Sequence, residues 1–187
     1  MKTALIVIDV QESFRSRPYW QADELPRFLA NTQSLIDRCR HRGIAILQVF
    51  HQEPGDATNP FSRASGRVRT LPELELEPDA VFYKEVHSAL FGKAADGTTL
   101  ERWLRDRGIE EILVTGIRTE QCCETTARHA SDLGFKVRYV TDATLTFAMQ
   151  SRSGRKFSPA QIRERTELVL DGRFARIVSA AETLLPT

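Results

Sequence analysis

The sequence has little cysteine and little histidine, and it contains no long apolar run. Its 187 residues include three cysteines and four histidines. An odd number of cysteines without framework spacing argues against a disulfide-stabilised secreted domain, so we expect free thiols and a reducing, cytoplasmic location. The apolar run near the N-terminus is about seven residues long before it meets Asp9, which is too short for a signal-peptide core or a membrane span. We therefore expect no membrane partner.

An excess of charge of one sign is also absent. The formal net charge is +1, so the composition gives no reason to expect a nucleic-acid partner. The glycines form neither a G-x-G-x-x-G pattern nor a phosphate-binding loop, and both nucleotide fingerprints are therefore missing. A chain of this length with 41% hydrophobic residues suits one domain with a sizeable core, which we expect to span residues 1–187.

The chain does contain short β-branched runs that alternate with segments of helical period. We predict strands at residues 4–10, 44–50, 80–83, 111–115, 135–141 and 174–178, and helices at 25–42, 100–107, 121–133 and 159–170. Residues 51–78 and 144–156 show no clean period and are predicted to be loops, and residues 179–183 a final short helix or tail. The alternation predicts an α/β fold with three layers, in which helices cover both faces of a six-stranded, mostly parallel, Rossmann-like sheet.

Chemically useful side chains fall where the predicted strands end. Asp9, His51 and Lys84 lie at the carboxyl ends of three strands, and the turn at residues 116–122 follows a fourth. In open parallel sheets, ligands bind outside the carboxyl ends of the strands. The sequence therefore predicts a functional site at this edge of the sheet.

Two adjacent cysteines occupy the first turn of the helix predicted after that turn. A thiol at a helix N-terminus is expected to have a lowered pKa. Neighbouring residues on a helix point about 100° apart, so only one cysteine can face the site. The period places Cys123 on a small-residue packing face, whereas Cys122, the third residue after a predicted Thr119 N-cap, would face the sheet end. We predict Cys122 as a nucleophile, and a vicinal disulfide is the less favoured alternative.

Asp9 and Lys84 each have two interpretations. An ionised carboxylate after an apolar strand is costly unless it is paired or used, so Asp9 is either a structural acid that begins the loop or a general base for the thiol. Lys84 is either a solvated lysine at a strand end or a cation that keeps Asp9 ionised and stabilises a developing negative charge. Their position at one sheet edge favours the second interpretation of both.

Metal-ligand residue types occur on one loop only. His51, Glu53 and Asp56 lie close together in the sequence, but a metal site usually needs three or four converging ligands, often with a second histidine. No histidine lies between His51 and His87. We therefore expect neither a metal nor a cofactor.

Three stretches resemble the isochorismatase-like cysteine hydrolase superfamily. Residues 4–14 (ALIVIDVQESF) match its apolar strand followed by Asp, Val and Gln, and residues 84–92 (KEVHSALFG) are close to its K-x-x-[FH]-S-A-F motif. Residues 114–144 match G-[VI]-x-T-x-x-C-[VC]-x-x-T-A-x-x-A followed by a strand and Asp-Ala. The three motifs occur in the family's order and cover nearly the whole chain, so the resemblance implies the family's fold.

The resemblance also implies a mechanism. Cys122 would attack a carbonyl carbon, Asp9 would take the thiol proton and later activate water, and Lys84 would keep the pair charged. It further implies a cis peptide bond before Arg118 and an oxyanion hole made by the backbone N–H groups of Arg118 and Cys122. The substrate would be a small molecule and the enzyme a homodimer or homotetramer. By position, the candidate substrate-binding residues are Gln11, Phe14, Trp20, His51, Arg118 and Phe147.

Departures from the family pattern narrow the expected reaction. Where the nicotinamidase branch has Asp-x-His-Pro, this chain has His51-Gln52-Glu53-Pro54, which argues against that branch's metal. Isochorismatases proper generally lack the nucleophilic cysteine, so Cys122 favours hydrolysis of an amide or ureido (N-carbamoyl) bond through a thioester. A vinyl-ether hydrolase that uses Asp9 without a covalent step is the alternative, and a catalytically silent scaffold is the third.

Arg118 stands where the family usually has a small residue. Its side chain either enters the pocket, where it would favour an acidic substrate, or turns to solvent. Both alternatives remain open from the sequence.

Overall fold

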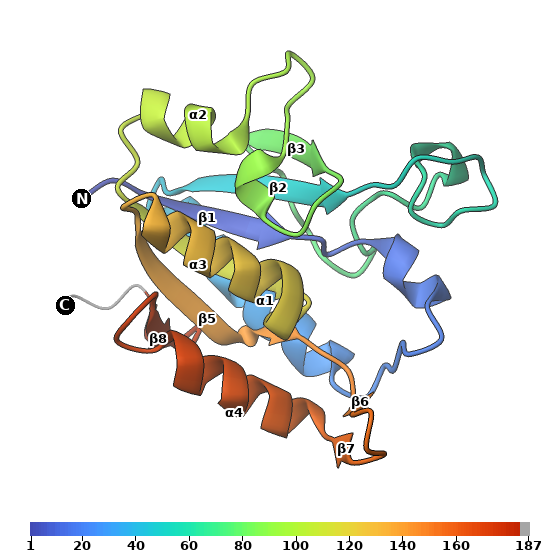
Figure 1. Cartoon of the computed structure of the whole chain (residues 1–187). Helices are drawn as coiled ribbons and strands as arrows, with labels where there is room; N and C mark the ends of the chain where they lie inside the picture. The colour runs from blue at the N-terminus through green and yellow to red at the C-terminus, as the bar shows by residue number, and fades with distance from the viewer. Residues whose placement is uncertain (184–187) are drawn as a thin grey trace.

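One six-stranded sheet forms the centre of the molecule (Figure 1). The structure is a computed structural model and describes residues 1–183. Every strand pairing in the large sheet is parallel, and the strand order is β3-β2-β1-β4-β5-β8. The predicted α/β fold with a six-stranded sheet is therefore confirmed. The strands are β1 (Thr3–Ile8), β2 (Ala45–His51), β3 (Ala80–Lys84), β4 (Glu111–Ile117), β5 (Lys136–Leu145) and β8 (Arg176–Val178).

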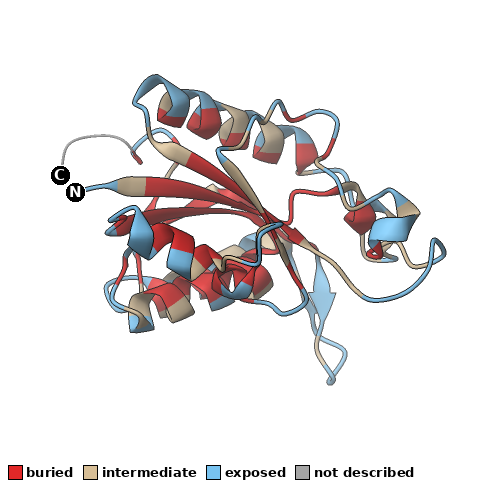
Figure 2. Cartoon of the chain, turned by 90° about the horizontal axis from the view of Figure 1, so that it is seen from above, coloured by how far each residue is buried: buried red, intermediate tan, exposed pale blue. Residues whose placement is uncertain are grey.

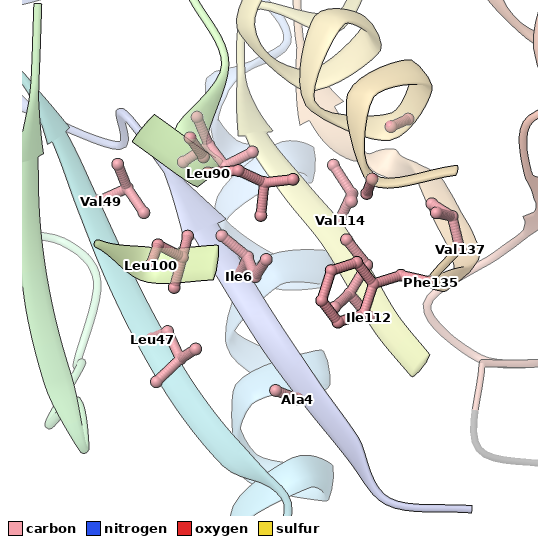
Figure 3. Packing of buried hydrophobic residues seen from close by; sticks show 14 of the residues in the cluster. Ala4, Ile6, Leu47, Val49, Leu90, Leu100, Ile112, Val114, Phe135 and Val137 are labelled. Atoms are coloured by element: carbon pink, nitrogen blue, oxygen red, sulfur yellow. The ribbon is translucent and has the colours of Figure 1, made fainter. Parts of the chain in front are cut away.

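Helices cover both faces of this sheet (Figures 1 and 2). Alternate residues of β1 face opposite sides: Leu5 and Val7 pack in the cluster that contains the apolar face of α1, whereas Ile6 and Ile8 pack with α2 and α3. Figure 3 shows the cluster on the side of α2 and α3, in which Ile6 lies between Leu100 and Val114. Burial on both faces explains why the strand sequences are continuously apolar. The helices are α1 (Leu25–His41), α2 (Leu100–Asp106), α3 (Glu124–Asp132) and α4 (Pro159–Leu170).

The first strand is shorter than predicted. β1 ends at Ile8 instead of Val10, because Asp9 takes a left-handed backbone conformation with φ of 54°. Aspartate tolerates this region better than most residues other than glycine. The Asp9 N–H still donates to the Val49 carbonyl at 2.8 Å. The chain therefore turns sharply at the residue that carries the predicted base.

Strands β4 and β5 are longer than predicted. The strand predicted at residues 111–115 ends before Gly116, but the pairing continues through Gly116 to Ile117, and that of β5 continues to Leu145, with a register shift between Val114 and Gly116. The polar Thr115 is fully buried there and its hydroxyl donates to the Ala143 carbonyl. A buried hydroxyl is tolerated in a strand when it is hydrogen-bonded.

Gly116 allows two central strands to come very close. It pairs with Ile8 and has a φ of 132°. A Cβ at this position would lie 1.9 Å from the Ile8 carbonyl oxygen. Only glycine fits this position. The close approach brings the residue after Ile8, Asp9, next to the turn that carries Cys122.

The turn into α3 differs from the prediction. Residues Thr119–Cys123 form a π-helical turn (η4), and α3 begins at Glu124. Thr119 does not cap the helix. Its hydroxyl lies 2.7 Å from that of Thr144, and Arg118 takes the extended position before the turn instead. Single π-helical turns occur frequently at functional sites.

The loops contain more local structure than predicted. Within residues 144–156 and just beyond, β6 (Met149–Gln150) and β7 (Lys156–Phe157) form a small antiparallel hairpin. Residues 179–183 form a turn closed by the Thr183 N–H and the Ser179 carbonyl. Among residues 1–183, no helix combines the length and the apolar composition needed to cross a lipid bilayer. Short helical turns also occur as η1 (Glu12–Ser16), η2 (Arg63–Ser65) and η3 (Ala89–Phe91).

Candidate active site

The three predicted catalytic side chains meet at the carboxyl end of the sheet. The Lys84 Nζ atom donates to Asp9 Oδ2 at 2.8 Å and lies 3.5 Å from the Cys122 Sγ atom. The side chains of Asp9 and Lys84 have no exposed surface, and Cys122 is 7% exposed. A cation is therefore in contact with both a carboxylate and a thiol in a nearly closed site.

The sheet order explains why a long side chain is needed at position 84. Strand β3 is separated from β1 by β2, where His51 is the register partner of Lys84. Neighbouring strands lie about 4.8 Å apart, so the backbones at the ends of β1 and β3 are roughly 10 Å apart. The flexible four-carbon stem of lysine spans much of this gap. Lys84 therefore reaches Asp9 and Cys122 across the end of β2.

Lys84 keeps its charge in this closed site. Burial alone lowers the pKa of its ammonium group, but the neighbouring Asp9 carboxylate and the Cys122 sulfur outweigh burial and raise that pKa. The Lys84–Asp9 contact is thus a buried ion pair, in which removing one partner leaves the other without compensation.

Cys122 does not have the lowered pKa that its position predicted. Burial raises the pKa of the Cys122 thiol, and the negative charge of Asp9 raises it further, while Lys84 opposes both. The prediction from the helix N-terminus was wrong because it left out desolvation, which exceeds the opposing effect of the Lys84 cation in this site. The resting side chain is therefore a thiol, and it needs a base.

Cys123 behaves as the predicted packing residue. It is fully buried in the same apolar cluster as Ala127 and Ala130, and burial raises the pKa of its thiol. All three cysteines are free, so the vicinal disulfide is not formed.

Two side-chain contacts join the segment after Lys84 to the helix after Cys122. The Thr126 hydroxyl donates to the Cys122 carbonyl at 2.6 Å and accepts from the Ala89 N–H at 2.9 Å. The Ser88 hydroxyl lies 2.8 Å from His129 Nδ1. Thr126 was not among the predicted site residues, although it is the second threonine of the motif at residues 116–130. Its hydroxyl fixes the backbone of the nucleophile relative to the segment that carries the cation.

Gln11 links two strand ends. It is fully buried, and its amide nitrogen donates to the Ser13 hydroxyl and to the His51 carbonyl, both at 2.9 Å. Its amide oxygen accepts from the His51 N–H at 2.9 Å. These contacts engage the side chain within the protein, so Gln11 positions the loop after β1 and does not face an open pocket.

His51 and Phe14 belong to an aromatic group around Phe61. The Phe61 ring lies 5.1 Å from the Phe14 ring and 5.8 Å from the His51 ring. Burial lowers the pKa of His51, and the Lys84 charge lowers it further, so the imidazole is neutral at pH 7. Its Nε2 atom lies 3.7 Å from Glu53, which also accepts a hydrogen bond from Arg17 at 3.0 Å.

Arg118 does not turn to solvent. It is 6% exposed, and its guanidinium lies 4.6 Å from the ring centre of Tyr19 and 5.7 Å from that of Phe147. Its Nη2 atom is 2.8 Å from Glu120 Oε1. The Trp20 ring centre lies 5.3 Å from that of Phe147. Tyr19 and Glu120 were not predicted, because only the folded chain brings them to Arg118.

The backbone before η4 has an unusual peptide. The bond between Ile117 and Arg118 is cis. The Arg118 carbonyl accepts from the Gln121 and Cys123 N–H groups, each at 3.2 Å. The Arg118 backbone is thus held against the turn that carries the nucleophile.

The loop after β2 shows no assembled metal site. His51 and Glu53 approach each other, but Asp56 accepts bonds from the N–H and the hydroxyl of Thr58 in its own turn. Within residues 1–183, no three or more histidine, cysteine or acidic side chains are grouped as metal ligands.

Comparison with known proteins agrees with the fold and the motifs. A family model described as "Isochorismatase domain" matches residues 3–173. Nicotinamidase 3 of Arabidopsis thaliana is 32% identical over 77% of this chain and 73% of that protein. The nicotinamidase/pyrazinamidase of Mycobacterium tuberculosis is 30% identical over 75% of this chain and 85% of that protein. A crystal structure of an isochorismatase-family protein from Chromobacterium violaceum superposes with a TM-score of 0.83 at 29% identity, covering 97% of this chain and 91% of that one. The chain therefore belongs to the isochorismatase family of hydrolases.

Proposed function

We propose that this protein is a cysteine-dependent amidohydrolase that cleaves a C–N bond, amide or ureido, of a small molecule. The observation that carries the proposal is the contact of Lys84 Nζ with both Asp9 and Cys122 in a buried site. Relatives named as nicotinamidases support hydrolysis of a carboxamide. A silent scaffold has no need for a buried ion pair against a thiol, so this geometry argues against it.

In the proposed reaction, Asp9 is the base. Its Oδ1 atom is buried and has no hydrogen-bond partner among the described residues, so it can accept the thiol proton. The Cys122 sulfur then attacks the substrate carbonyl carbon, and the backbone N–H groups of Arg118 and Cys122 stabilise the oxyanion. Collapse of this adduct breaks the C–N bond, and the proton moves from Asp9 to the leaving amine. Water, deprotonated by Asp9, attacks the thioester carbonyl and breaks the C–S bond, and the proton on Asp9 returns to the Cys122 sulfur as the acid product leaves.

Lys84 makes this proton transfer possible. Because burial raises the pKa of the Cys122 thiol, a free thiolate would be unstable in the resting site. The Lys84 ammonium lies 3.5 Å from the sulfur, so it stabilises the thiolate as the proton leaves for Asp9. The cation therefore remains next to negative charge at every stage of the reaction.

The experiment that tests the proposal looks for both the reaction and its intermediate. A panel of small amides and ureido acids is screened for ammonia release, and rapidly quenched samples are analysed by mass spectrometry of the intact and the digested protein. We expect an acyl adduct on the peptide that contains Cys122. Cleavage of a vinyl ether that persists after removal of the Cys122 thiol would instead support the ether-hydrolase alternative. The expected homodimer or homotetramer is a further prediction, which light scattering can test.

Thr126 provides a test of how the nucleophile is positioned. Thr126→Val removes a hydroxyl that holds the Cys122 carbonyl and leaves the buried Ala89 N–H unpaired. We expect kcat to fall by about tenfold or more with little change in KM, because the reacting sulfur loses its alignment. Thr126→Ser, which keeps the hydroxyl, should recover most of the rate. Steady-state kinetics of the substrate found in the screen measures both effects.

The matched control for Thr126 is Thr32→Val. Thr32 is also fully buried, but its hydroxyl has no hydrogen-bond partner among the described residues. This substitution should leave kcat unchanged and should not destabilise the fold. Equal kinetics for the Thr126→Val and Thr32→Val proteins would contradict the positioning role.

A further inference from the structure

Three ion pairs compensate the charges of Lys84, Arg118 and Arg17 in the region of the proposed active site. The Lys84–Asp9 pair has no exposed side-chain surface, and the side chains of the Arg118–Glu120 pair are 8% and 9% exposed. Arg17, whose guanidinium lies over the Phe61 ring, is paired with Glu53. His51, which lies in the same region, is neutral because its pKa is lowered by burial and by Lys84. The charges within these three pairs therefore balance.

We infer that the part of the substrate that lies beside Cys122 carries no net charge, and that Glu120 is the residue that enforces this selectivity by neutralising Arg118. This inference rests on the proposed function and narrows it to uncharged amides and ureido compounds. It argues against the alternative, left open by the sequence, that the Arg118 side chain favours an acidic substrate.

The Arg118–Glu120 pair is held in place from both sides. The Arg118 guanidinium is enclosed by the rings of Tyr19 and Phe147, and its Nη2 atom contacts the Met149 sulfur at 3.0 Å. The Thr146 hydroxyl donates to the second Glu120 oxygen at 2.6 Å. Glu120 cannot move away from Arg118 without breaking that hydrogen bond. The Arg118–Glu120 pair therefore has a fixed position and no net charge.

The pair still leaves hydrogen-bonding capacity unused. The contact between Arg118 Nη2 and Glu120 Oε1 is close, but its angles do not make a hydrogen bond, and both Glu120 Oε1 and Arg118 Nε lack hydrogen-bond partners among the described residues. We take the contact as an ion pair, because charge attraction depends on distance more than on angle. Charge neutrality, and not saturation of hydrogen bonds, is therefore the property that Glu120 provides.

A carboxylate brought next to this pair would meet cations that are already compensated. Lys84, the cation beside the sulfur, is paired with Asp9, and Glu120 compensates the charge of Arg118. Transfer of an unpaired carboxylate from water into a site this buried is strongly unfavourable. A neutral amide of the same shape avoids that penalty. The site should therefore discriminate between isosteric substrates by charge.

The test compares succinamide with succinamate, which have the same shape and differ by one negative charge. The wild-type enzyme should show the larger kcat/KM for succinamide. Glu120→Gln keeps the shape of the side chain and an acceptor for Thr146 but leaves Arg118 uncompensated. We expect the ratio of kcat/KM for succinamate to that for succinamide to rise by about tenfold to a hundredfold in this variant. A ratio measured within one protein preparation is insensitive to partial misfolding.

The matched control is Glu111→Gln. Glu111 is likewise a buried glutamate paired with an arginine, Arg138, at 2.9 Å, but it lies at the first residue of β4, at the opposite end of the sheet. Its substitution should leave the charge ratio unchanged. A wild-type preference for succinamate, or an unchanged ratio in Glu120→Gln, would overturn the inference.

A second measurement separates this inference from the proposed function. If neither compound releases ammonia, protection of Cys122 from iodoacetamide by each compound reports binding alone. Better protection by succinamide in the wild-type protein, shifted toward succinamate by Glu120→Gln, would support charge selectivity even if the reaction type is wrong. Better protection by succinamate in the wild type would reject the selectivity.

Discussion

Replacing Cys122 with alanine is expected to reduce amide turnover by about 10⁴-fold or more while leaving the fold intact. Single removals of a covalent nucleophile have effects of this size, because the remaining groups cannot form the intermediate. The site retains a buried base and a buried cation, Asp9 and Lys84, but neither is placed to replace the sulfur. The substitution removes one atom from the side chain, so the loss of unfolding free energy should be small. Ammonia release and thermal unfolding measure the two quantities.

The neighbouring cysteine offers a control within the same turn. Cys123→Ala makes the same chemical change one residue away, in a side chain that is fully buried in the apolar cluster. We expect this variant to lose more stability than Cys122→Ala but to keep most of its activity. Near-full activity in Cys122→Ala would reject the covalent mechanism. Loss of activity only in Cys123→Ala would assign the nucleophile to Cys123.

Replacing Lys84 with methionine is expected to have the largest effect on stability. The substitution keeps the apolar stem but leaves the Asp9 carboxylate buried without its cation, and breaking a buried pair in this way costs about 3–5 kcal/mol of unfolding free energy. The Cys122 thiolate also loses the cation 3.5 Å away, so turnover should fall to background. Urea unfolding and steady-state kinetics measure these losses. Lys93→Met, at an exposed lysine, should change neither quantity appreciably.

The pH dependence provides an independent check on the Lys84 pair. The pKa of Lys84 is raised in the folded protein, so its contribution to stability is fully present below the unfolded pKa of about 10.4 and is lost as the pH rises through the folded value. The Lys84→Met variant should lack this alkaline loss. If the variant were as stable as the wild type at pH 7 and equally sensitive to alkali, the pair would not stabilise the fold.

The fold class and the positions of the three proposed catalytic residues could be predicted from the amino-acid sequence alone. Strand runs such as residues 4–8 are recognisable because burial on both sheet faces requires an uninterrupted apolar sequence, which is a local property. Asp9, Lys84 and Cys122 stand at fixed places in three short motifs, and each motif sits next to a strand end. The carboxyl ends of parallel strands meet at one edge, so the convergence of these residues followed without coordinates.

Where elements begin and end was only partly determined by the sequence. The left-handed conformation of Asp9, the π-helical turn at η4 and the extension of β4 and β5 all depend on contacts made by neighbouring strands. Gly116 is one such case, because its lack of a side chain matters only where Ile8 comes close. A local sequence pattern does not show which distant residues will make these contacts.

The electrostatics of the site could not be predicted before the chain was seen in its folded form. The protonation state of Cys122 depends on how deeply the packed chain buries it and on the Asp9 charge beside it, and Lys84 has the opposite and smaller effect. The role of Arg118 depends on Tyr19 and Phe147, each more than 25 positions away in the sequence, and on whether Glu120 turns toward it. Desolvation and charge pairing are properties of the packed surroundings of a group, and those surroundings exist only after the chain has folded.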